Sequence, residues 1–150
     1  MKLYALTDLH VRAPENRQAL GALSPHPEDW LILAGDVGET REDLEFTFQT
    51  LAPRFRQLIW VPGNHELWTL PRAPSSARGE AKYRELVSLC EDYGVLSPEH
   101  PYPQWPGEGP PRVIAPLFLL YDYSFRPDDV PEQSAIQWAL ESGVLGTDEA

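Results

Sequence analysis

The sequence predicts an α/β fold built around a parallel sheet. Three short apolar segments, residues 2–7, 30–34 and 58–61, have the length and the flanking turn residues of buried strands. Amphipathic segments separate them, and alternation of strands with helices favours parallel strands joined by right-handed crossovers. A chain of 150 residues with 42% hydrophobic and 23% charged residues is long enough to bury one core. We therefore expect a single globular domain.

Two helices are expected between these strands. The first covers residues 15–23, which lie between two prolines. The second begins at a capping-box pattern, in which Thr40 and Asp43 can each bind the other's backbone amide, and it stops at Pro53. One face of this helix carries the apolar residues Leu44, Phe48 and Leu51.

The second half of the chain predicts fewer regular elements. Apolar residues at helical spacing over residues 86–93 indicate a third helix, with Gly94 as its C-terminal cap. Residues 97–112 are rich in proline and glycine, so we expect a surface loop. Residues 113–123 have the pattern of a further strand, and residues 129–143 begin with a helix-start signature and end at a glycine.

Charge and composition exclude several classes of function. A net charge of -11 repels phosphate backbones and anionic lipids, so nucleic acid is an improbable partner. No apolar run approaches the ~20 residues of a membrane span, and the polar pair Thr7-Asp8 comes too early for a signal peptide. We therefore expect a cytoplasmic protein without a membrane partner. The single cysteine, Cys90, cannot form an internal disulfide and is expected to be a small buried residue.

A polar motif follows each of the three predicted strands. In order, the motifs are Asp8-Leu9-His10, Gly35-Asp36 and Gly63-Asn64-His65-Glu66. Each of the first two alone is explained by an ordinary polar turn, whereas the third is more specific, because a bare turn has no need of an imidazole beside an amide. A plain α/β scaffold with polar turns is one interpretation. The carboxyl ends of parallel strands, however, meet at one edge of a sheet, where ligands bind. Three such motifs in sequence therefore predict a shared site.

The three motifs resemble the D-x-H, G-D-x-x and G-N-H-E motifs that open the calcineurin-like metallophosphoesterase superfamily. The resemblance implies an α/β fold that forms the first half of a metallophosphoesterase-type β-sandwich flanked by helices, in α/β/β/α layers. It also implies that Asp8 and His10 bind a first metal ion and that Asp36 bridges two ions. Asn64 would then bind the second ion, and His65 would protonate the leaving group. The implied reaction is hydrolysis of a phosphomonoester or phosphodiester substrate.

Physical chemistry supports a dinuclear site of this kind. Two divalent ions about 3.5–4 Å apart can clamp the attacking and leaving oxygens of a phosphoryl displacement. Imidazole, carboxylate and amide donors together suit Mn, Fe, Zn or Ni, and Mn is our first expectation. A carboxylate is needed to orient His65, and Asp36 and Glu66 are both candidates. Trp68, just beyond the third motif, is either a wall of a substrate pocket or a surface anchor.

The chain departs from the superfamily pattern after the third motif. A later histidine and a G-H-x-H motif are missing, and the two remaining histidines, His26 and His100, are expected in surface loops. The second ion would keep only Asp36 and Asn64. We therefore expect residues 1–150 to be a metallophosphoesterase domain lacking its C-terminal part, completed by a longer chain or by a second chain. The alternative is a noncatalytic module that binds a metal or a phosphate.

Overall fold

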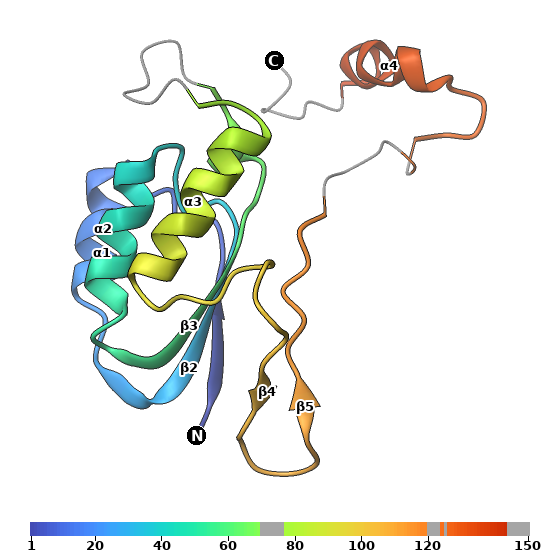
Figure 1. Cartoon of the computed structure of the whole chain (residues 1–150). Coiled ribbons are helices and arrows are strands. Elements are labelled where there is room, and N and C mark those ends of the chain that lie inside the picture. Colours follow the sequence, from blue (N-terminus) through green and yellow to red (C-terminus); the bar gives the residue numbers. More distant parts are fainter. Residues whose placement is uncertain (70–76, 120–123, 125, 144–150) are drawn as a thin grey trace. The chain divides into compact units, whose positions relative to one another are not determined.

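The computed structural model describes residues 1–69, 77–119, 124 and 126–143 in two compact units, Met1–Phe118 and Leu119–Ala150 (Figure 1). The first unit contains β1 (Leu3–Leu6), α1 (Pro14–Gly21), β2 (His26–Ala34), α2 (Arg41–Leu51), β3 (Phe55–Val61), the helical turn η1 (His65–Leu67), α3 (Glu80–Asp92), β4 (Gln104–Trp105) and β5 (Arg112–Val113). The second contains the helical turn η2 (Glu132–Ser134) and α4 (Ala135–Glu141). No helix among the described residues is both long enough and apolar enough to cross a membrane.

The first three strands form one parallel sheet in the order β1-β2-β3, as predicted. Its register aligns Leu6 with Leu33 and Leu33 with Trp60 across the three strands. In Figure 1, α1, α2 and α3 all cover the same face of this sheet. The α/β fold with a parallel sheet flanked by helices is therefore confirmed.

The hydrophobic core lies between that face and the three helices. The sheet contributes side chains that alternate along each strand, because successive residues point to opposite faces. The fully buried members from the sheet and helices include Leu33, Trp60, Leu44, Phe48, Leu51, Leu86, Leu89 and Cys90. The expected burial of Cys90 is confirmed, and its apolar surroundings raise the pKa of the thiol far above the usual range.

The start of α2 has the predicted capping box. Thr40 accepts a hydrogen bond from the Asp43 amide at 3.2 Å, and the Asp43 carboxylate accepts one from the Thr40 amide at 3.3 Å. Asp43 is also paired with Arg17 of α1 at 3.1 Å. This one carboxylate therefore both begins α2 and fastens it to α1.

The structure corrects three expectations outside the sheet. Residues 97–112 are not wholly irregular, because β4 pairs antiparallel with β5, and the Arg112 guanidinium lies over the Trp105 ring at 5.3 Å. The predicted strand 113–123 is wrong from Ile114 to Leu119, which form no strand among the described residues, although the Ile114 amide still donates to the Pro103 carbonyl at 2.9 Å. Residues 120–123 lie outside the described part. The expectation of a loop at His26 is also wrong, since this residue begins β2 and its ring stacks on Phe55.

The remaining helices follow the sequence pattern closely. α1 ends at Gly21, two residues before the expected end, and α3 extends further toward the N-terminus than its apolar repeat indicated. Gly94 follows α3 with φ of 65°, a conformation that glycine adopts without steric cost. In the second unit, α4 follows η2, and Gly143 lies just beyond its end.

Replacing Thr40 with alanine should lower the free energy of unfolding by about 1 kcal/mol, because an N-cap side chain is lost. Urea denaturation of the variant and its parent measures this difference. Thr40→Ser is the matched control, because it keeps the hydroxyl, and it should stay within about 0.5 kcal/mol of the parent. Equal unfolding midpoints for Thr40→Ala and the parent would contradict the capping account.

Candidate metal centre

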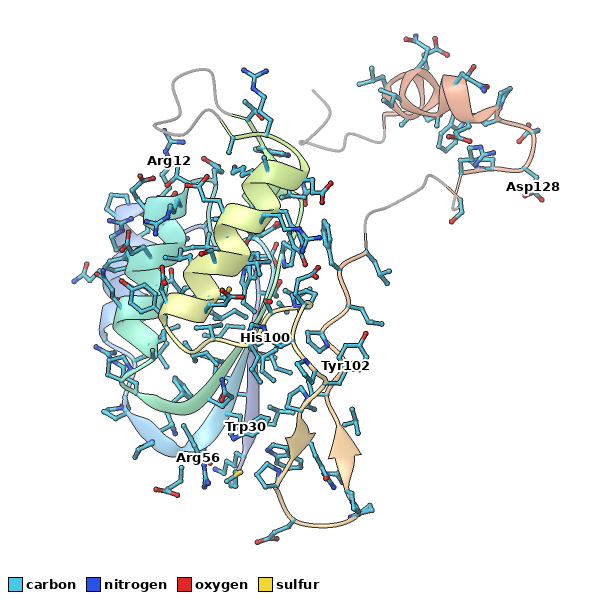
Figure 2. All side chains as sticks on the ribbon, in the orientation of Figure 1. Arg12, Trp30, Arg56, His100, Tyr102 and Asp128 are labelled. Atoms are coloured by element: carbon cyan, nitrogen blue, oxygen red, sulfur yellow. The ribbon has the colours of Figure 1, made fainter. Side chains whose placement is uncertain are left out.

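The loops that follow β1 and β2 lie side by side at the carboxyl edge of the sheet. The amide of Asp8 donates to the Gly35 carbonyl at 3.2 Å, and the amide of His10 donates to the Asp36 carbonyl at 3.0 Å. The same series of hydrogen bonds continues at Val11, whose amide donates to the Val37 carbonyl at 2.9 Å. Two motifs that are far apart in sequence are therefore joined by backbone hydrogen bonds. Figure 2 shows Arg12 at this end of the unit and Arg56 toward the opposite end.

Three predicted metal ligands have an unusual backbone conformation. Asp8, His10 and Asp36 have φ values of 55°, 40° and 53°, and they are the only non-glycine residues of the described chain with positive φ. Such a conformation costs free energy for a residue with a Cβ atom, so the surrounding structure must enforce it. Strain of this kind collects at functional sites, which agrees with a site at these three positions.

Two glycines allow the second and third motifs to approach each other. A Cβ atom on Gly63 would lie 2.1 Å from the Asp36 carboxylate oxygen Oδ1, which leaves no room for any side chain. A Cβ atom on Gly35 would lie 2.9 Å from the Gly63 nitrogen, and Gly35 itself has φ of 87°. The absence of side chains at these positions therefore lets the Asp36 carboxylate sit directly beside the third motif.

The buried carboxylate of Glu66 fixes this arrangement. Glu66 is completely inaccessible to solvent, and it accepts hydrogen bonds from the amides of Asp36 at 3.1 Å, Val37 at 2.8 Å and Gly63 at 2.8 Å. Burial raises the pKa of Glu66, and these amide hydrogen bonds oppose the rise because they favour the charged form. Glu66 was one of two candidates for orienting His65. Its carboxylate instead binds the backbone of both motifs.

The side chains of His10, Asp36 and His65 form one compact cluster. One potential ligand atom of each lies within 4.8 Å of those of the other two, and all three residues are half-buried. The two imidazole rings meet edge to face with centroids 4.7 Å apart. Two imidazoles and a carboxylate in so small a space have the chemistry of a divalent transition-metal site.

The other two predicted ligands flank this cluster. Asp8 is exposed, lies outside the three-residue cluster, and accepts a hydrogen bond from the Thr7 hydroxyl at 2.7 Å. Asn64 is half-buried and directly precedes η1, where its carbonyl accepts from the Leu67 amide at 3.0 Å. The structure therefore brings two predicted ligands and the predicted proton donor together, with Asp8 and Asn64 on adjoining backbone.

Sequence reasoning missed the carboxylate beside His65, which belongs to Glu39. Its oxygen Oε1 lies 3.5 Å from Nδ1 of His65, and its Oε2 accepts a hydrogen bond from Arg12 at 2.7 Å. Partial burial acts to raise the pKa of Glu39, but the hydrogen bond and charge of Arg12, together with His65, outweigh it and lower the pKa. The one sequence feature that could have indicated Glu39 is its position in the same loop as the Gly35-Asp36 motif.

Trp68 covers a face of the His65 ring. The two ring centroids are 3.7 Å apart, with the planes tilted by 33°. His65 therefore has a carboxylate near its Nδ1 edge and an aromatic ring over one face. This contact favours the interpretation of Trp68 as a wall of the site, one of the two uses that the sequence left open.

Replacing Glu66 with glutamine should lower the free energy of unfolding by about 2 kcal/mol, because the amide group supplies only one acceptor oxygen for three backbone donors. Chemical denaturation measures the loss. The matched control is Glu91→Gln in the exposed last turn of α3, which should have almost no effect. An unchanged stability of Glu66→Gln would mean that the carboxylate does not hold the two loops together.

The chain is similar to known proteins over nearly its whole length. The family described as calcineurin-like phosphoesterase matches residues 1–118. The [acyl-carrier-protein] phosphodiesterase PptH of Mycobacterium tuberculosis is 45% identical over 149 residues, which make up 98% of this chain and 46% of the relative. The crystal structure of phosphopantetheinyl hydrolase (PptH) from the same organism has a TM-score of 0.89 and covers 98% of this chain and 53% of the solved one, again at 45% identity.

These matches confirm the resemblance drawn from the three motifs. The fold also corresponds to the first half of the expected metallophosphoesterase architecture, since the chain spans about half the length of the relatives that it matches. The family match covers the sheet and every residue of the cluster. The chain belongs to the calcineurin-like phosphoesterase family.

Proposed function

We propose that this chain carries the metal-binding half of a metal-dependent phosphodiesterase. The observation that carries the proposal is the cluster of His10, Asp36 and His65 at the ends of three parallel strands. Family membership supports hydrolysis of a phosphoester as the reaction. The strained backbone at Asp8, His10 and Asp36 adds independent support, because the structure maintains it at a cost in stability.

In this proposal Asp8, His10, Asp36 and Asn64 hold two divalent ions, with Mn as the expected metal. The donor set fits, because it combines imidazole, carboxylate and amide groups, half-buried at His10, Asp36 and Asn64 and exposed at Asp8. Bound divalent ions would neutralise charge on the phosphoryl oxygens and activate water for attack. Local cations would also attract an anionic phosphate to a chain whose net charge is -11.

His65 is the proposed general acid. Oε1 of Glu39 lies 3.5 Å from its Nδ1 atom, and a carboxylate that accepts a hydrogen bond from Nδ1 would fix the tautomer and the orientation of the ring. Nε2 then remains to donate a proton to the departing oxygen as the bond between that oxygen and phosphorus breaks. The water oxygen forms the new bond to phosphorus, so the products are an alcohol and a phosphate ester with one fewer organic group.

The names of the relatives suggest the substrate. PptH is described as an acyl-carrier-protein phosphodiesterase and as a phosphopantetheinyl hydrolase, and its 45% identity extends over all three motifs. We propose that the protein to which this chain belongs cleaves the phosphodiester between a carrier protein and its phosphopantetheinyl group. The cytoplasm remains the expected location.

One observation favours a second candidate function, a noncatalytic metal-binding module. Among the described residues, neither His26 nor His100 joins the cluster. His26 stacks on Phe55, and Nδ1 of His100 accepts a hydrogen bond from the Ser97 amide at 3.0 Å. The second ion would thus have only Asp36 and Asn64 from this part of the chain. A module of this kind would bind at most one ion and would not turn over.

The first test is hydrolysis of bis(p-nitrophenyl) phosphate and of a phosphopantetheinylated carrier protein by the full-length protein with Mn²⁺. Removing metal with EDTA should abolish turnover, and returning Mn²⁺ should restore it. Asp36→Asn should lose more than about 100-fold in kcat, because a direct ligand matters at least as much as the groups that orient ligands. Asp92→Asn at the exposed end of α3 is the control. An Asp36→Asn protein as active as its parent would overturn the proposal, and metal binding without turnover would favour the module.

The role of His65 makes a separate prediction. His65→Gln should retain metal affinity, measured by calorimetry, while kcat for an alkyl phosphodiester falls by about 100-fold or more, since proton donation is lost. A p-nitrophenyl ester should be affected much less, because its leaving group departs without protonation. A large loss of metal affinity in His65→Gln would instead make His65 a metal ligand, as its place in the cluster also permits.

A further inference from the structure

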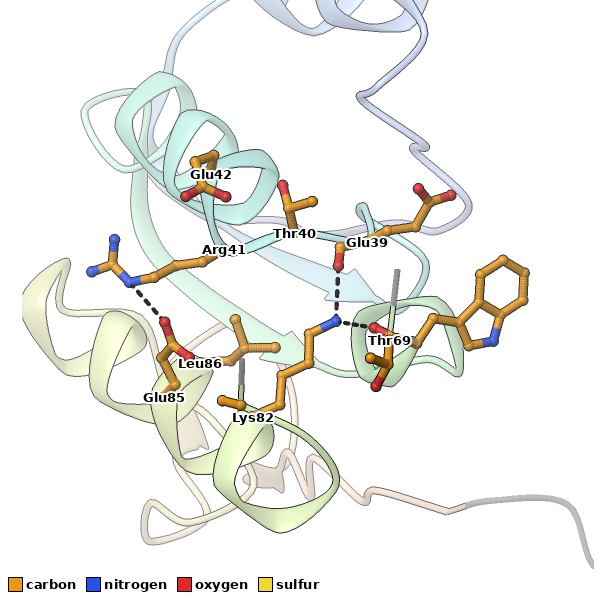
Figure 3. Close-up of a pocket in the computed structure, with 10 residues that line it drawn as sticks. Glu39, Thr40, Arg41, Glu42, Thr69, Lys82, Glu85 and Leu86 are labelled. Carbon is orange, nitrogen blue, oxygen red and sulfur yellow. Dashed lines mark hydrogen bonds and ion pairs between the residues drawn. The ribbon is translucent and has the colours of Figure 1, made fainter. Parts of the chain in front are cut away.

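Lys82 of α3 is a buried lysine that the proposed reaction does not use. The residue lies near the start of α3 and is only 8% exposed. The Nζ atom donates a hydrogen bond to the Glu39 carbonyl at 2.8 Å and another to the Trp68 carbonyl (Figure 3). Lys82 therefore joins α3 to the loop after β2 and to the segment after η1.

Burying this ammonium group costs desolvation free energy, so the presence of a lysine at residue 82 needs an explanation. Burial lowers the pKa of Lys82, while the charges of Glu66, Glu39 and Glu85 act in the opposite direction. An apolar side chain of similar length would fill the space without that penalty. A purely packing role for residue 82 is therefore a poor explanation for a lysine.

Direct contact with substrate is also a poor explanation. The space beside Lys82, lined by residues that include Thr40, Arg41 and Leu86, has a volume of about 20 Å³. A cavity of this size holds roughly one water molecule. The described residues therefore leave no room for a phosphoester at the ammonium group.

Both carbonyls bound by Lys82 belong to residues that contact the imidazole of His65. The Glu39 carboxylate lies 3.5 Å from Nδ1 of His65, and the Trp68 ring lies over the imidazole with centroids 3.7 Å apart. Each contact depends on where its backbone segment is held. A single cation that binds both segments consequently fixes the positions of two groups that contact the imidazole.

We propose that Lys82 is a positioning residue, which holds Glu39 near the Nδ1 atom of His65 and Trp68 over its ring face, and so orients the imidazole for proton transfer. The positioning follows from the hydrogen bonds, whereas its catalytic consequence rests on the proposed role of His65. Lys82 is not a member of the cluster of His10, Asp36 and His65, and the space beside its ammonium group is too small for a phosphoester.

The positioning is tested without turnover, by NMR of the His65 ring in the metal-free full-length protein. Stacking on Trp68 places the imidazole protons in the shielding region of the indole, so their signals should lie upfield, with His65→Gln used for assignment. Lys82→Met should move these signals back toward the positions of a free imidazole. Arg84→Met, an exposed change two residues along α3, should leave them in place. Unchanged signals in a folded Lys82→Met would overturn the proposal. If Lys82→Met does not fold, Lys82→Gln, which keeps one donor group, takes its place with the same two outcomes.

The catalytic consequence is tested by comparing leaving groups. Lys82→Met should lower kcat for an alkyl phosphodiester about 10-fold or more, as a supporting group around a catalytic residue does, with little effect on a p-nitrophenyl ester. The same change on the His65→Gln background should add almost nothing, because the effect passes through His65. Equal losses on both esters, or additive losses, would contradict a positioning role. If the parent protein does not turn over at all, the proposed function fails, and the NMR result still decides the placement of His65 by Lys82.

Discussion

The geometry of the site depends on one buried carboxylate. Glu66 accepts hydrogen bonds from the amides of Asp36, Val37 and Gly63, so it binds the loop after β2 to the loop after β3. Without the Glu66 carboxylate, these three amides would lack an acceptor, which would lower the free energy of unfolding by a few kcal/mol. The left-handed backbone of Asp36 and the contact between its carboxylate and Gly63 both become tolerable because Glu66 holds the two loops together.

A second layer of interactions builds on this clamp. Asp36 is fixed by Glu66 and by the amide of His65, which donates to its Oδ1 atom at 3.4 Å. The imidazole of His65 is then contacted by the Glu39 carboxylate and the Trp68 ring, and the backbone carbonyls of both residues accept hydrogen bonds from Lys82. Hydrogen bonds to the backbone thus place the residues that carry the chemistry. The carboxylate of Asp36 and the imidazoles of His10 and His65 are then left close together. Such preorganisation suits a metal site, where ligands must keep their geometry before the ion binds.

Local sequence rules predicted the elements that local interactions determine. The parallel sheet followed from three apolar segments separated by helical ones, and the start of α2 followed from the reciprocal hydrogen bonds between Thr40 and Asp43. The three motifs identified the edge of the sheet where the cluster forms. By contrast, the strand expected over residues 113–123 failed from Ile114 to Leu119, because an apolar segment becomes a strand only where another strand pairs with it. The contacts of Glu39 and Lys82 were also invisible, since they join segments separated by 26 and 43 residues.

The most direct measurement of the central claim is a crystal structure of the full-length protein grown with Mn²⁺, with anomalous scattering recorded at the manganese edge. The account predicts an anomalous peak within coordination distance of the Asp36 carboxylate and the His10 imidazole, and a second peak on the other side of Asp36 toward Asn64. Occupied manganese sites located elsewhere, with Asp36 and His10 free of metal, would contradict it.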